Sequence, residues 1–91
     1  MPVVCRFTFP EGTDREVMEA HLALAIIATE CTFGKPKVRL SAAYCLAKEV
    51  PQIVIDVSTE VGEHIAQIFA GLMMHEIGEE AFSVDRIADA S

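Results

Sequence analysis

The order of hydrophobic and polar residues predicts a strand near the start of the chain. In VVCRFTF, residues 3–9, the two kinds alternate with the period of two that marks a strand with one buried face. The side chains expected in the core are those of Cys5, Phe7 and Phe9. Pro10 and Gly12 are turn residues and predict the end of this strand.

A helix is predicted to begin at Thr13, because Glu16 follows it at the spacing of a capping box. The stretch from Leu22 to Ala28 is apolar throughout, so this helix must be covered on more than one side. Gly34 predicts its end, since glycine is the usual residue just beyond a helix C-terminus.

Residues 37–58 predict a β-hairpin. We interpret 37–46 as a strand with alternate side chains in the core: Val38, Leu40, Ala42, Tyr44 and Leu46. An alternative is a strand that gives way to a short helix over SAAYCLAKE, 41–49, because Ala, Leu, Lys and Glu favour helix. The run 52–58 is rich in β-branched residues and predicts the second strand, with a turn over 47–51.

The clearest amphipathic helix is predicted to begin at Ser58 or Thr59 and to end at Gly78. Its apolar face consists of Val61, Ile65, Ile68, Phe69, Leu72, Met73 and Ile77. A last strand follows over 81–87, with Phe82 and Val84 expected to point toward the core.

The expected order is therefore strand, helix, strand, strand, helix, strand. Two right-handed crossovers joined by a hairpin predict a ferredoxin-like α+β sandwich. We expect one domain over 1–91, with an antiparallel sheet ordered 4-1-3-2 and two helices on one face.

Composition narrows the classes of function. The 91 residues carry a net charge of −7, which repels phosphate backbones and anionic membrane surfaces, so neither nucleic acid nor a membrane is an expected partner. Three cysteines at wide spacings fit reduced thiols better than a disulfide framework. The start of the chain lacks the features of a secretory signal, and we expect a cytoplasmic protein.

The strand alternation places charged residues on the sheet face away from the helices. In the expected strand order these residues form a row of Asp85, Arg6, Asp56 and Arg39. A solvated row of opposite charges is one interpretation. The other is a binding or interface surface, because Val4, Ala43, Cys45 and Val54 share this face and suit packing against a second copy.

His75 and Glu79 have the four-residue spacing at which two side chains on a helix can bind one metal ion. Gly78 should end the helix between them, however, and a structural metal site needs three or four ligands. His64 lies about 16 Å from His75 along the same helix and cannot share that ion. A helix end with solvated acidic residues is the competing interpretation.

Nucleophile elbows, phosphate-binding glycine loops and paired carboxylates in an apolar setting are not found in the sequence. We therefore expect a non-catalytic homo-oligomer, without a cofactor, that binds a small molecule or another protein. The alternative is a small enzyme or metal-binding protein that uses His64, His75 and Glu79.

Overall fold

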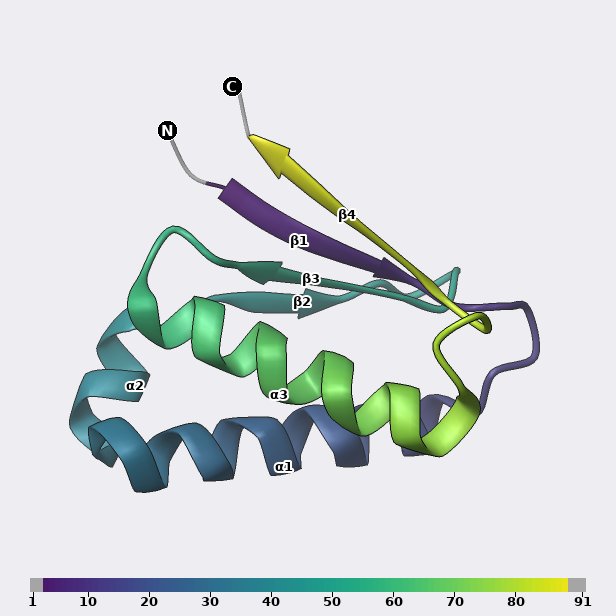
Figure 1. The fold of residues 1–91 in the computed structure, drawn as a ribbon. Helices are drawn as coiled ribbons and strands as arrows, with labels where there is room; N and C mark the ends of the chain where they lie inside the picture. The colour runs from purple at the N-terminus through teal and green to yellow at the C-terminus, as the bar shows by residue number, and fades with distance from the viewer. Residues whose placement is uncertain (1–2, 89–91) are drawn as a thin grey trace.

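The computed structural model describes residues 3–88. They form an α+β structure with a four-stranded antiparallel open sheet and three helices (Figure 1). The elements in chain order are β1 (Val3–Thr8), α1 (Arg15–Phe33), α2 (Lys35–Ser41), β2 (Tyr44–Leu46), β3 (Gln52–Asp56), α3 (Glu60–Ile77) and β4 (Ser83–Ala88).

The sheet has the strand order β2-β3-β1-β4, and every neighbouring pair is antiparallel. Counted from the opposite edge, the same strands read 4, 1, 3, 2. The helices lie on one side of the sheet, and no element within residues 3–88 covers the other side (Figure 1). The sheet therefore has one buried and one open face, as its alternating side chains require.

The core lies between the sheet and the helices, and α3 contributes its largest share of buried residues. Phe7 of β1 and Phe69 of α3 are both buried, and their rings meet edge to face with centroids 5.0 Å apart. Ile53 and Ile55 of β3 are fully buried on the same side of the sheet. The apolar face predicted for α3 is confirmed at its centre, where Ile65, Phe69 and Met73 are fully buried.

Both long helices begin at capped residues and end at glycine. The Asp14 carboxylate accepts a hydrogen bond from the Glu16 amide at 2.9 Å, so Asp14 rather than Thr13 is the N-cap of α1. Thr59 caps α3 by accepting from the Gly62 amide. The predicted glycine stops are confirmed, because Gly34 and Gly78 have φ near +90° directly after α1 and α3.

The prediction of a strand from residue 37 is wrong. Residues 35–41 form α2, and the strand is confined to 44–46, so the alternative of a helix over 41–49 is wrong as well. Pro36 in the first turn of α2 presets a helical φ. Val38 and Ala42 then pack against the core one helical turn apart, whereas Leu40 is 89% exposed.

Val84 was expected in the core but is 44% exposed, because β4 is an edge strand. Phe82, just before β4, does pack against the core and lies beside the rings of Phe7 and Phe9. The predicted turn over 47–51 is confirmed by the antiparallel pairing of β2 with β3.

Candidate functional site

The charge row predicted for the open sheet face is only half assembled. Arg6 and Asp85 are register partners on β1 and β4, and an Arg6 Nη lies 3.3 Å from the Asp85 carboxylate. Arg39, by contrast, belongs to α2 and not to the sheet, so its predicted place in the row is wrong.

Asp56 does not continue the row either. It stands opposite Val4 at the end of β3, one step beyond the pair formed by Arg6 and Val54. Its carboxylate accepts hydrogen bonds from the hydroxyl and the amide of Ser58, at 2.5 and 2.8 Å. These bonds hold the pKa of Asp56 below its ordinary value. They also join the carboxylate to the loop that leads into α3, away from the charge row.

The candidate metal ligands are not brought together with a third. His75 occupies the last turn of α3, and Glu79 follows beyond Gly78; both are exposed. His64 lies near the opposite end of the same helix. Across residues 3–88, no three His, Cys, Asp or Glu side chains are grouped so that they could hold a metal ion.

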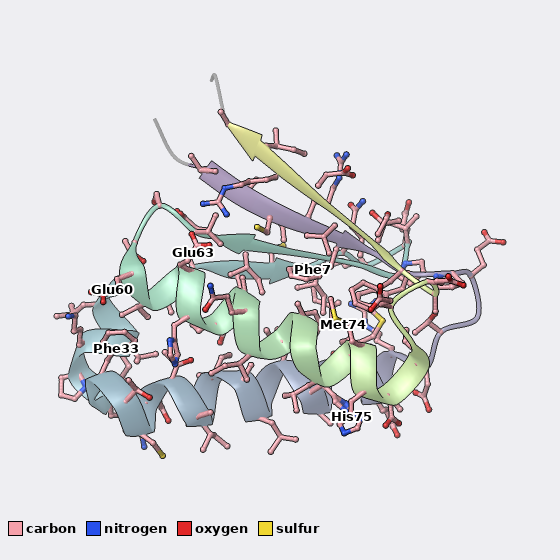
Figure 2. The ribbon with its side chains drawn as sticks, in the orientation of Figure 1. Phe7, Phe33, Glu60, Glu63, Met74 and His75 are labelled. Atoms are coloured by element: carbon pink, nitrogen blue, oxygen red, sulfur yellow. The ribbon has the colours of Figure 1, made fainter. Side chains whose placement is uncertain are left out.

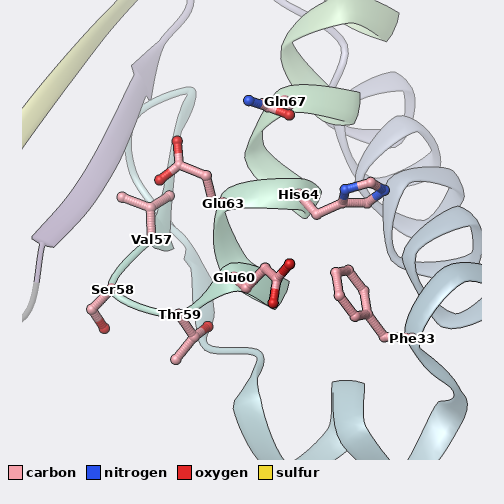
Figure 3. A pocket seen from close by; sticks show the side chains of 8 residues that line it. All are labelled: Phe33, Val57, Ser58, Thr59, Glu60, Glu63, His64 and Gln67. Carbon is pink, nitrogen blue, oxygen red and sulfur yellow. The ribbon is translucent and has the colours of Figure 1, made fainter.

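A cavity of about 460 Å³ opens instead where the end of α1 meets the start of α3 (Figure 3). We call it the α1/α3 cavity. Its lining residues are Phe33, Val57, Ser58, Thr59, Glu60, Glu63, His64 and Gln67. The acidic and aromatic members gather at this end of the molecule, whereas His75 lies at the other end of α3 (Figure 2).

Helix boundaries create this cavity. Gly34 ends α1 directly after Phe33, so the Phe33 ring is presented at the helix end. Thr59 starts α3 on the opposite wall, which places Glu60, Glu63 and His64 in its first two turns. The rings of Phe33 and His64 meet edge to face across the cavity, with centroids 5.3 Å apart.

The two glutamates of the cavity differ in their surroundings. Glu63 accepts two hydrogen bonds from the Arg86 guanidinium of β4, at 2.8 and 3.1 Å. This bidentate contact lowers the pKa of Glu63, and the positive charge of Arg86 balances the negative charge of the carboxylate. For Glu60, no hydrogen bond or ion pair of the side chain is found within residues 3–88, and Figure 3 shows its carboxylate facing the cavity near Phe33.

A positively charged side chain of the protein itself lies over the Phe33 ring. The Lys37 Nζ atom, from the first turn of α2, lies 5.0 Å from the ring centroid. An ammonium at this distance over an aromatic face is attracted by the electrons of the ring. The aromatic wall of the cavity is thus a surface on which the chain itself places a positive charge.

The hydroxyl groups of the cavity are engaged elsewhere. Ser58 donates to Asp56, and Thr59 donates to the Ser41 carbonyl at 3.3 Å. No hydrogen bond joins His64 to either hydroxyl among the described residues. Neither hydroxyl is therefore paired with His64 in the way that an adjacent base activates a nucleophile.

Sequence reasoning missed Phe33, Glu60, Glu63 and Arg86. For Arg86 a signal existed, because alternation with Val84 places it on the helix side of the last strand, where a charge needs a partner. The cavity itself had no signal, since Phe33 and the other residues that line it are at least 24 residues apart along the chain.

No protein-family model matches this sequence, and comparison with curated proteins finds no significant match. None of the helices in residues 3–88 has the length and apolar character needed to cross a membrane.

Proposed function

We propose that this chain is a non-catalytic binding module that takes a small organic cation, such as a primary amine, into the α1/α3 cavity. The observation that carries the proposal is the Glu60 carboxylate, which faces the cavity beside the aromatic rings of Phe33 and His64. An ammonium group there gains a charge-assisted hydrogen bond and an aromatic face together.

Charge favours a cation over an anion in this cavity. Glu63 is neutralised by Arg86, which leaves Glu60 as the carboxylate available to a ligand. The net charge of −7 also raises the local concentration of cations around the molecule. A phosphate or carboxylate ligand would meet repulsion from both sources.

The Lys37 ammonium over Phe33 supports the same ligand class. A free amine can occupy the cavity side of the ring, or it can replace Lys37 on the ring face. Phe33 and Glu60 line the same cavity, so the ring and the free carboxylate belong to one site.

Three broader proposals accompany this one. We propose a ferredoxin-like architecture with α2 inserted before β2, supported by the strand order and by the helices on one face. We also propose a cytoplasmic location, which the free thiols of Cys31 and Cys45 at the surface favour. Finally, we propose that the module is a homo-oligomer.

The ligand proposal is tested by titrating labelled protein with putrescine and ethanolamine while recording two-dimensional amide NMR spectra. We expect saturable shifts at Glu60, His64 and the end of α1. Glu60→Gln should weaken binding by at least about tenfold, because one charge-assisted hydrogen bond is lost.

Glu79→Gln is the matched control, since it removes a carboxylate that is also exposed and lies beyond the other end of α3. Its affinity should equal that of the parent chain. Shifts spread over all acidic residues, or equal binding by the Glu60 and Glu79 variants, would show only general attraction of cations and would refute the site.

A further inference from the structure

The two edges of the sheet differ in how they are protected. On the β2 side, the Ala43 carbonyl accepts from the Asp56 amide at 2.8 Å, and the Ala47 amide donates to the Gln52 carbonyl at 2.9 Å. Backbone groups of an antiparallel strand point alternately to its two sides. Residues 43, 45 and 47 therefore bond to β3, and the N–H and C=O groups of Tyr44 and Leu46 point outward.

An apolar groove lies beneath this outer edge. The register pairs Tyr44 and Leu46 with the fully buried Ile55 and Ile53, so their side chains lie on the helix side of the sheet. Together with α1 they form a groove of about 480 Å³. Its lining residues are Glu19, Leu22, Ala23, Ile26, Tyr44, Cys45 and Leu46.

The opposite edge strand, β4, has an inward-pointing charged residue that opposes the addition of another strand, and β2 has none. Arg86 of β4 points inward from the edge and pairs with Glu63, and charged residues of this kind block pairing with another strand. The outward groups of β2 are flanked by Tyr44, Cys45 and Leu46, none of which is charged. Tyr44 is 50% exposed, so apolar surface accompanies the free backbone groups.

This edge is complementary to a second copy of itself. If two β2 strands meet antiparallel with Cys45 opposite Cys45 of the partner, Tyr44 stands opposite the partner's Leu46, and Leu46 opposite its Tyr44. The outward N–H and C=O groups of these residues then form four hydrogen bonds. The two grooves meet at the same axis, so the apolar residues of both α1 helices are covered together.

The charges at the two ends of β2 fit the same arrangement. One end follows α2, whose charged residues are all basic: Lys35, Lys37 and Arg39. The other end approaches the start of α1, because the Arg15 guanidinium donates to the Lys48 carbonyl at 3.3 Å. There, residues 11–19 and 48–49 together hold five acidic side chains against two basic ones, Arg15 and Lys48. An antiparallel pairing lays the basic end of each copy beside the acidic end of the other.

We propose that β2 pairs with β2 of a second copy about a two-fold axis at Cys45, which joins the two sheets into one of eight strands. The proposal specifies the interface of the homo-oligomer proposed above and rests on that proposal. It is independent of the ligand cavity, which lies between α1 and α3 and includes no residue of β2.

The first test is the sedimentation of the chain at tens of micromolar in near-physiological salt, where a Debye length of about 8 Å limits repulsion between two acidic molecules. We expect a dimer. Tyr44→Lys places an inward charge on the β2 edge, as Arg86 does on β4, and should weaken the dimer at least about tenfold.

Val84→Lys is the matched control, since Val84 is similarly exposed and points to the same side from the other edge strand. It should leave the dimer unchanged. A monomeric parent chain, or a dimer equally affected by both variants, would overturn the proposal.

A second test does not depend on a variant of the edge. Directly opposed residues of a non-hydrogen-bonded pair have Cα atoms about 4.5 Å apart, within the range of a disulfide. In a Cys31→Ser chain, mild oxidation should therefore link two copies through Cys45. Cys45→Ser, which retains the exposed Cys31, should not form the linked dimer. Failure of Cys45 to cross-link would overturn the proposed axis, even if the chain is dimeric.

Discussion

Gly62, in the first turn of α3, lies against the end of β3 with no room for a side chain. A Cβ atom built there would lie 1.8 Å from the Asp56 carbonyl oxygen. The Gly62 amide also donates a hydrogen bond to the hydroxyl oxygen of Thr59, the N-cap residue of α3. The start of α3 can therefore pack against the end of β3 only if this position has no side chain.

Two glycines of α3 should respond oppositely to the same substitution. Gly62→Ala should destabilise the fold by about 3 kcal/mol, because backbone atoms must move apart. Gly71→Ala should stabilise it by about 0.5–1 kcal/mol, since its Cβ would meet nothing within 4 Å and alanine favours helix. Urea unfolding of both variants measures this, and equal effects would contradict the close approach.

The contact between Glu63 and Arg86 should make stability depend on pH in a defined range. Hydrogen bonds from Arg86 lower the pKa of Glu63 from its ordinary value of 4.5, so folding is favoured when the carboxylate is charged. The stabilisation is complete above pH 4.5 and is lost as pH falls through the lowered value. The difference in unfolding free energy between the parent chain and Glu63→Gln should therefore stay constant from neutral pH to about pH 5 and shrink below it. A difference that grows on acidification would contradict this assignment.

At the scale of elements, the sequence predicted correctly those helices whose ends are marked by neighbouring residues. The caps and glycines of α1 and α3 are local, and these helices were predicted nearly in full. In 35–41 the alternation of Val38 and Leu40 was an equally good strand pattern. What favours helix there is Pro36 in the first turn together with the packing of Val38 and Ala42, and that packing is tertiary.

Replacing Val38 and Leu40 separately distinguishes helix from strand. Val38→Ala should cost about 2 kcal/mol, for two buried carbon groups and the space they leave. Leu40→Ala should change stability by less than about 0.5 kcal/mol, because this side chain is exposed. In a strand both residues would face the core, so comparable losses in thermal unfolding would contradict α2.

The candidate site was less predictable than the fold because its contacts depend on tertiary packing. Alternation correctly put Arg6 and Asp85 on the same sheet face, because successive side chains of a strand point to opposite faces. It could not show that Asp56 would turn to Ser58, or that Arg86 would reach Glu63. These contacts depend on where α3 begins relative to the sheet, which no local pattern specifies.

At the scale of the whole molecule, the reactivity of the three thiols tests both the fold and the proposed dimer. Cys5 is buried, and its burial raises the pKa of the thiol, so little reactive thiolate is present near neutral pH. Cys31 and Cys45 are exposed on α1 and β2. We expect Cys5 to react with a thiol reagent only when the chain unfolds.

The two exposed thiols should differ only where copies pair. At nanomolar concentration Cys31 and Cys45 should react at similar rates, because each is accessible in a single chain. At tens of micromolar Cys45 should become protected while Cys31 does not, since pairing across β2 covers one and leaves the other at the end of α1. Mass spectrometry of the labelled chain resolves the sites. Protection of both thiols would place the contact on another surface, and protection of neither would mean that β2 stays free.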